Sequence, residues 1–175
     1  NGLSSNALRS LDATALSTSQ LAGLSATTVG NFSVVQFRSF SATQIGVFTG
    51  SQTGNVSQTV VSSLSNSQIG ALSASALSGL SQSAVGGFSA GQVGALSVNA
   101  LNGLSTTQIG SFNASQTQAL SLNQLNGLGQ ANFAALKAGA FTTSQLQGLG
   151  AGFSKLSASQ FNSLSQTQIS GLSTG

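Results

Sequence analysis

Residues 65–72 read SNSQIGAL, residues 89–96 read SAGQVGAL, residues 105–112 read STTQIGSF and residues 121–128 read SLNQLNGL. These stretches share an eight-residue pattern, an octad, with Ser at position one, Gln at position four, an aliphatic residue at position five and a large apolar residue at position eight. The octads keep their phase from Asn1 to Leu136. A fixed period of this kind indicates a repeat fold and has to be interpreted before any other feature. The position-eight residues are Leu8, Leu16, Leu24, Phe32, Phe40, Phe48, Val56, Leu64, Leu72, Leu80, Phe88, Leu96, Leu104, Phe112, Leu120, Leu128 and Leu136.

Each octad carries a helix start signal. A Ser followed three residues later by Gln is a capping box, in which the Ser side chain accepts from a backbone N–H of the first turn and the Gln side chain accepts from the Ser N–H. Position eight of one octad and position five of the next, such as Leu64 and Ile69, then form a hydrophobic staple. A start signal every eight residues predicts one short helix per octad, followed by a corner.

Three other structures fit the pattern less well. In one continuous helix the apolar positions would drift off a single face, and the frequent Gly and Ser would weaken it. A strand requires alternation with a period of two, whereas positions five and eight are three apart. A disordered chain is favoured by the enrichment in Ser, Gln and Gly, but disorder does not require apolar residues at a fixed phase. Cooperative helical melting would exclude disorder.

A second, longer period appears when the octads are taken three at a time. Position-four glutamines recur at Gln20, Gln44, Gln68, Gln92 and Gln116. We therefore predict an all-α repeat, a three-sided solenoid of very short helices with about 8 residues per side and 24 per coil, in which stacked coils supply each other's core. Gly and Ala at positions six and seven would let backbones approach closely. The column of five glutamines is either a functional row of amides or, as we favour, a set of residues that only close their own capping boxes.

The octad register shifts after Leu136. Residues 137–141 are three short of an octad and residues 150–156 are one short, while residues 142–149, 157–164 and 165–172 follow the pattern again. Trimming one side of a solenoid is tolerable. We therefore predict a single repeat domain over residues 1–175, with regular octads in 1–136 and irregular coils in 137–175. A local bend or partner site at the irregular coils is the alternative.

The composition argues against catalysis. The chain has no His, Cys or Glu, and Asp12 is its one acidic residue. No ordinary general base is therefore present, and no carboxylate or thiolate cluster could hold a metal. Ser154 lies next to Lys155, but we interpret Lys155 as a solvated side chain. The sequence predicts a protein that is not an enzyme and has no catalytic residue, cofactor or metal.

The charge distribution limits the partners. Only four cations occur in 175 residues, so the high isoelectric point reflects the shortage of acids. Four scattered cations do not form a phosphate-binding stripe, so no nucleic-acid partner is expected. No apolar run is as long as a membrane-spanning helix requires, so no membrane insertion is expected. The chain begins with Asn, which we take as the start of a mature or excised segment. A long uncharged surface favours self-association.

The motif in residues 64–72 (LSNSQIGAL) and 104–112 (LSTTQIGSF) resembles repeat regions of large secreted or surface proteins of Gram-negative bacteria. Some of these are adhesin-like and others haem-utilisation-like. The resemblance covers essentially the whole chain, implies an extracellular or cell-surface fibrous setting and carries over no functional residue. A haem role is unsupported, since the chain has no His, Cys, Met or Tyr to ligate iron.

The leading functional hypothesis is an extracellular structural protein, a subunit or segment of a filament, sheath or adhesin stalk that associates end to end. Solenoid ends are normally protected by atypical polar repeats. The last octad is close to consensus, however, so we expect an assembly end formed by Ser165, Gln168, Ile169 and Leu172. The first octads diverge, with Ser5 and Ala13 at position five. The alternative is an ice- or carbohydrate-binding solenoid with a possible surface glycan as partner, although most hydroxyls lie at helix caps.

Overall fold

The computed structural model describes residues 12–172, except for the side chain of Ala151. The described chain is helical throughout and contains no strand: 18 α-helices and three 3-10 helices follow one another. Ser5 lies outside the described residues. In chain order the elements are η1 (Ala13–Ala15), α2 (Thr18–Ala22), α3 (Ala26–Gly30), α4 (Val34–Ser39), α5 (Ala42–Ile45), α6 (Gly50–Thr53), α7 (Gln58–Ser63), α8 (Asn66–Gly70), α9 (Ala74–Gly79), α10 (Gln82–Gly86), α11 (Ala90–Gly94), α12 (Val98–Gly103), α13 (Thr106–Gly110), α14 (Ala114–Gln118), α15 (Leu122–Gly127), α16 (Gln130–Ala135), η2 (Ala138–Ala140), α17 (Thr143–Gly148), η3 (Gly150–Lys155), α18 (Ala158–Asn162) and α19 (Gln166–Leu172).

The capping box sets where each helix begins. In α8 the N-cap Ser65 has extended backbone angles, φ −69° and ψ 161°. Its N–H donates to Gln68 Oε1 at 2.8 Å, and its hydroxyl accepts from the Gln68 N–H at 3.2 Å. The helix after it is one or two turns long because the next octad brings another extended N-cap. The predicted helix per octad is therefore confirmed over residues 17–136, and before them Ala13–Ala15 form a 3-10 helix.

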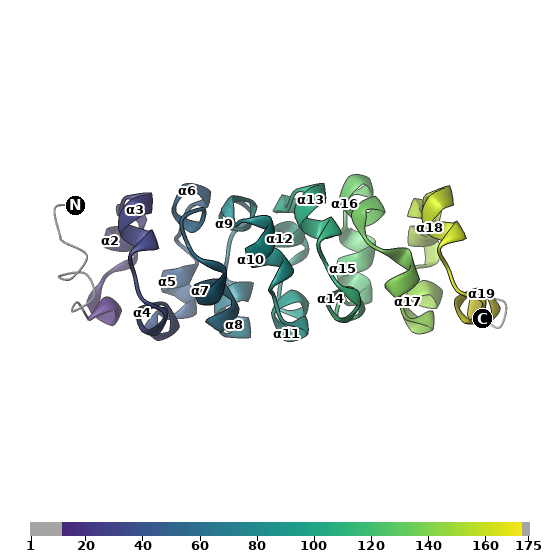
Figure 1. Cartoon of the computed structure of the whole chain (residues 1–175), viewed down its shortest axis with the longest axis horizontal. Helices are drawn as coiled ribbons and strands as arrows, with labels where there is room; N and C mark the ends of the chain where they lie inside the picture. Colours follow the sequence, from purple (N-terminus) through teal and green to yellow (C-terminus); the bar gives the residue numbers. More distant parts are fainter. Residues whose placement is uncertain (1–11, 173–175) are drawn as a thin grey trace.

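The short helices stack along one long axis, running from α2 to α19 (Figure 1). Each extensive contact between elements joins one element to the element three positions later. Thus α2, α5, α8, α11 and α14 form one contact series, and α4, α7, α10, α13 and α16 form another. Over the regular octads the stacked helices are therefore three octads apart in the sequence, as the longer period predicted. None of the helices in residues 12–172 is long and apolar enough to cross a membrane.

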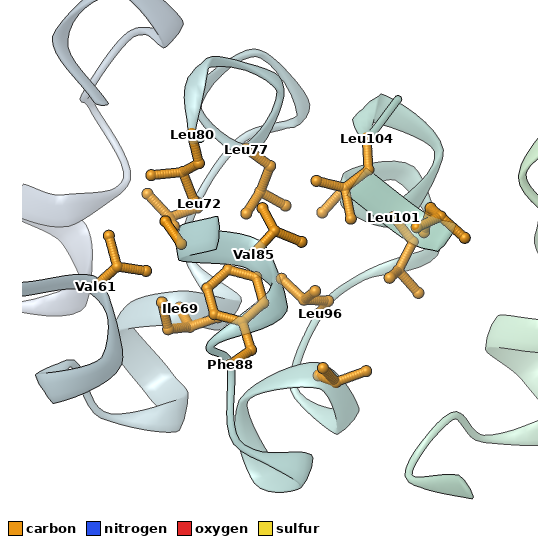
Figure 2. Close-up of a cluster of buried hydrophobic side chains, with 14 of the residues drawn as sticks. Val61, Ile69, Leu72, Leu77, Leu80, Val85, Phe88, Leu96, Leu101 and Leu104 are labelled. Carbon is orange, nitrogen blue, oxygen red and sulfur yellow. The ribbon is translucent and has the colours of Figure 1, made fainter. Parts of the chain in front are cut away.

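The core is a single cluster of apolar side chains that extends from Ala13 to Leu164. It is built mainly from positions five and eight of successive octads, with Val60, Ala76, Ala84 and Ala100 added from position four. Figure 2 shows one section of it, where Ile69, Val85 and Leu101 at position five meet Phe88 and Leu104 at position eight. Position five is 0–3% exposed from Ala13 through Leu146. No octad has an apolar face large enough for a core of its own, so the stacked neighbours provide it.

Glycines at positions six and seven let the stacked helices approach at their backbones, as expected. A Cβ placed on Gly79 would collide with the backbone of Gly50 in the preceding helix of the series. A Cβ on Gly103 would lie 2.5 Å from the Cβ of Ala74. Real Cβ atoms essentially never come so close, so glycine is required where these two pairs of helices meet.

The irregular segments after Leu136 fold as 3-10 helices that keep their place in the stack. Element η2 contacts both α14 and α18, and η3 contacts α16. Ala138 and Phe141 remain 1% and 3% exposed, so the core continues past Leu136. The connection into η3 passes through Gly150, whose φ of +50° is a left-handed conformation that favours glycine. The core therefore continues without interruption through the segments that are shorter than an octad.

Candidate functional site

The position-four glutamines form the most regular polar arrangement in the molecule. Each one closes a capping box with its Oε1 atom. Gln92 Oε1 accepts from the Ser89 N–H at 2.8 Å, and Gln116 Oε1 accepts from the Asn113 N–H at 2.7 Å. These side chains are buried, with Gln92 2% and Gln116 1% exposed. A buried amide costs free energy unless both of its polar atoms are hydrogen-bonded, so the Nε2 atom needs partners as well.

Those partners are backbone carbonyls at the C-terminal end of the helix four elements earlier. Gln68 Nε2 donates to the carbonyls of Phe37 and Phe40, at 2.9 Å and 2.7 Å. The last carbonyls of a helix have no partner inside that helix, so the amide supplies one. We call these side chains the capping amides. The same arrangement joins Gln52 to the end of α2, Gln92 to α7, Gln108 to α9, Gln116 to α10, Gln124 to α11, Asn132 to α12, Gln145 to α14, Gln160 to α16 and Gln168 to η2.

Each glutamine among the capping amides therefore ties the start of its own helix to the end of a helix in the previous layer, whereas Asn132 makes only the contacts to the end of α12. No buried side-chain nitrogen or oxygen within residues 12–172 lacks a hydrogen-bond partner. The sequence interpretation identified the Oε1 half of this arrangement and missed the Nε2 half. The composition did contain a signal for the Nε2 contacts. Glu completes a capping box as well as Gln does, yet this chain contains no Glu, and only an amide carries a donor beside the acceptor.

The five glutamines predicted to form a column lie in α2, α5, α8, α11 and α14, which contact each other in sequence. Their amides bond to backbone and not to each other. Gln68, Gln92 and Gln116 are buried, and Gln44 is half-buried with its Nε2 2.8 Å from the Leu16 carbonyl oxygen. Gln20 is exposed, because the described chain has no earlier layer for it to cap.

Lys155 replaces a capping amide in the irregular element η3. Its Nζ donates to the carbonyls of Asn126 at 2.6 Å and Leu128 at 2.8 Å, which lie at the C-terminal end of α15. The ammonium also lies 5.9 Å from the centre of the Phe133 ring. The interpretation of Lys155 as a freely solvated side chain was therefore wrong. A cation suits this place because it is also favoured by the negative end of a helix.

Apart from α15, which Lys155 caps, five helix ends inside the stack have no capping amide, because position four of the relevant later octad is Val60, Ala76, Ala84, Ala100 or Ala140. All five of those helices have glycine at position six. For four of them, Gly30, Gly46, Gly54 and Gly70, an added Cβ would lie 2.8–3.2 Å from a carbonyl oxygen of the next layer. Close backbone approach therefore accompanies the absence of a capping amide.

The far end of the stack presents apolar side chains to solvent. Ile169 is 44% exposed and Phe161 is 43% exposed, although both occupy position five, which is buried from Ala13 through Leu146. Of the other residues predicted for an assembly end, Ser165 is exposed, Leu172 is half-buried and Gln168 is buried with its Nε2 2.6 Å from the Phe141 carbonyl oxygen. Sequence reasoning did not include Phe161 in the assembly end, because Phe161 lies in α18 and not in the last helix, α19.

Two of the ionisable groups, Asp12 and Lys155, are engaged in structural contacts. The described residues contain no group of three His, Cys, Asp or Glu side chains that could hold a metal ion. Asp12 caps η1, and hydrogen bonds from the Thr14 hydroxyl and backbone N–H lower the pKa of its carboxyl. With Lys155 Nζ engaged by two carbonyls, the Ser154–Lys155 pair has no free amine to act as a base.

Comparison with known proteins adds no assignment. No protein-family model matches the chain, and no curated protein matches it in sequence. A function is therefore inferred from the two features described above, the capping amides and the exposed apolar end.

Proposed function

We propose that this chain is an extracellular structural protein, a subunit or segment of a filament, sheath or adhesin stalk. In this proposal the helical repeat is a three-sided solenoid with one coil per three octads. The contacts between elements three positions apart support that geometry. A side of the solenoid is then one contact series, such as α2, α5, α8, α11 and α14.

The observation that carries the proposal is the exposed end at α18 and α19. Position five is 0–3% exposed from Ala13 through Leu146, whereas Phe161 and Ile169 expose 43% and 44% of their surfaces. Removing such apolar surface from water is favourable by roughly 25 cal/mol per Å². A further coil of the same repeat has the shape and apolar positions to cover both side chains. Repeated heterologous contacts of this kind produce open filaments.

The composition supports a structural role over a chemical one. Five charged side chains in 175 residues leave little with which to recognise nucleic acid or to perform acid–base chemistry. We accordingly propose a non-enzymatic protein that needs no cofactor and whose main partner is itself or a neighbouring repeat. The extracellular or cell-surface setting rests on the resemblance to secreted repeat regions and on the low charge.

Electron microscopy of the purified chain over a range of concentrations tests the proposal. We expect filaments whose width matches one solenoid or a small bundle of them, with a length that grows with concentration. Short rods that never join at any concentration would contradict end-to-end assembly. Such rods would favour the alternative, an ice- or carbohydrate-binding solenoid that uses its lateral faces. Thermal-hysteresis and glycan-binding assays would test that alternative.

The location is tested separately on intact source cells. An antibody raised against the folded chain should label the cell surface or extracellular material without permeabilisation. Labelling that appears only after permeabilisation would contradict the proposed setting.

A further inference from the structure

We propose that the joint between copies is made by Gln20 of one copy, whose amide caps the C-terminal end of α18 in another copy. In this joint α2 of the second copy stacks on α19 of the first. The inference rests on the proposed end-to-end assembly and specifies which atoms form it.

The acceptors are the backbone carbonyls of Phe161, Asn162 and Leu164. They occupy positions five, six and eight of their octad. In α10 the equivalent carbonyls of Val85, Gly86 and Phe88 accept from Gln116 Nε2 at 3.4, 3.0 and 2.8 Å. At α18 no side chain of the described residues donates to the corresponding three oxygens. The amide that caps a helix end comes from the element four positions later, and among the described residues only α19 follows α18.

The donor is the Nε2 atom of Gln20. Its Oε1 accepts from the Ser17 N–H at 2.8 Å, so the side chain is already held in the capping-box conformation of the buried glutamines. The residue is exposed, and its Nε2 has no acceptor within residues 12–172. By contrast, Gln44 in the next helix of the same series donates to the carbonyls of Thr14 and Leu16. Gln20 therefore presents an oriented and unused donor at the opposite end of the stack from the unused acceptors.

The internal packing fixes the register of the joint. Inside the molecule a helix stacks on the element three positions earlier and its amide caps the element four positions earlier, as α14 does with α11 and α10. When α2 of the second copy stacks on α19, the same rule places Gln20 against α18. The stacked coil then covers Ile169 and Phe161, the two position-five side chains that are exposed.

Gln20→Glu tests the donor without removing the capping box. Glu keeps an oxygen for the Ser17 N–H and replaces the Nε2 donor with a second oxygen that faces the carbonyls. We expect the concentration needed for assembly to rise about tenfold or more, the effect of roughly 1.4 kcal/mol. Gln82→Glu is the matched control, because Gln82 is exposed in the middle of the stack, and it should assemble like the unmodified chain. Circular dichroism should show both variants folded.

Crosslinking tests the register. The chain has no cysteine, so Ser19→Cys and Asn162→Cys each introduce one thiol, beside the donor and at the acceptor end. A short bis-maleimide added to an equimolar mixture should produce the mixed dimer in preference to either homodimer. Homodimers of Ser19→Cys alone, or no crosslink while filaments are present, would overturn the joint.

The outcomes separate this inference from the proposed function. If the unmodified chain forms filaments and Gln20→Glu forms them equally well, the joint is overturned while end-to-end assembly stands. If the unmodified chain never assembles, both are overturned.

Discussion

At the residue scale, the molecule depends on a side chain that is both an acceptor and a donor. A position-four glutamine accepts from the N-cap of its own helix and donates to the end of another helix, and both contacts are buried. Among the side chains that can complete a capping box, Gln offers both functions and Glu offers only acceptors at neutral pH. The absence of Glu from the whole sequence fits this requirement.

Gln92→Glu should therefore be strongly destabilising although it is isosteric. Its second oxygen would face the Leu64 carbonyl oxygen, which is 2.8 Å from Nε2 in the native chain. We expect the free energy of unfolding to fall by about 3 kcal/mol at pH 7. The measurement is urea denaturation followed by circular dichroism, with the exposed Gln82→Glu as control.

The same variant should regain stability in acid. Burial beside carbonyl oxygens raises the folded pKa of the new carboxyl above its unfolded value of about 4.3, so the deficit grows as the pH rises through that range. Below about pH 4 the protonated acid can donate to Leu64, and the difference from the unmodified chain should shrink. A deficit that does not change with pH would mean that lost packing, rather than the lost donor, explains the effect.

Lys155 caps a helix end as a capping amide does, with a different functional group. Lys155→Ala removes the hydrogen bonds to the Asn126 and Leu128 carbonyls, so we expect a loss of about 1–2 kcal/mol in the free energy of unfolding. Lys137→Ala is the control, because Lys137 is exposed at the N-cap of η2 and makes no side-chain cap hydrogen bond. Equal stability of the two variants would contradict the capping role.

Sequence reasoning predicted one of the two contacts that each capping glutamine makes. The capping boxes follow from the spacing of Ser and Gln, because both partners lie within one octad. The Nε2 contacts of the capping glutamines join residues 24–31 apart, as in Gln92 with Val61 and Leu64. They could not be read from the local pattern, since each joins two elements that lie four positions apart in the chain. The role of Lys155 depends in addition on the shortened element η3.

At the element scale, some helix ends are capped by an amide from a later layer, and others approach the next layer closely at their backbones. The five helices whose later octad has Val60, Ala76, Ala84, Ala100 or Ala140 at position four carry glycine at position six. The pairs α6 with α9 and α9 with α12 meet through glycines at position seven. The three-octad period predicted which octads would stack. It did not predict that residues 138–140 and 150–155 would form 3-10 helices, because the octad signal is lost there.

Gly79→Ala tests the close approach. The added methyl group would collide with the backbone of Gly50, and backbone atoms can retreat only by moving the whole helix. We expect a loss of about 2 kcal/mol in the free energy of unfolding. Gly110→Ala is the matched helical control, because its nearest neighbour would be 3.6 Å away, an ordinary contact. That control should be neutral or up to about 1 kcal/mol more stable, since Ala favours helix over Gly. Similar losses in both variants would contradict the close-packing explanation.

At the scale of the whole molecule, stability should be nearly independent of pH. The chain has no His or Cys, the side chains that ordinarily change charge near neutral pH. Asp12 has a lowered pKa, so its contribution is fully present above the unfolded value of about 3.9 and is lost as the pH falls through the folded value. Thermal melting should therefore have a constant midpoint from about pH 5 to 9. A shift above about 3 °C, which is roughly 1 kcal/mol at this size, would contradict the prediction.

The capping amides also set an order of events for a chain that emerges with its N-terminus first. Each amide lies C-terminal to the carbonyls that it serves, 28–31 residues later in the case of Gln52 and the end of α2. A newly made helix end therefore has no capping amide until several more octads have been synthesised. In such a chain the helix ends are capped in order from the N-terminus toward the C-terminus. A chain halted during synthesis therefore leaves its most recent helix ends without the side chains that would cap them.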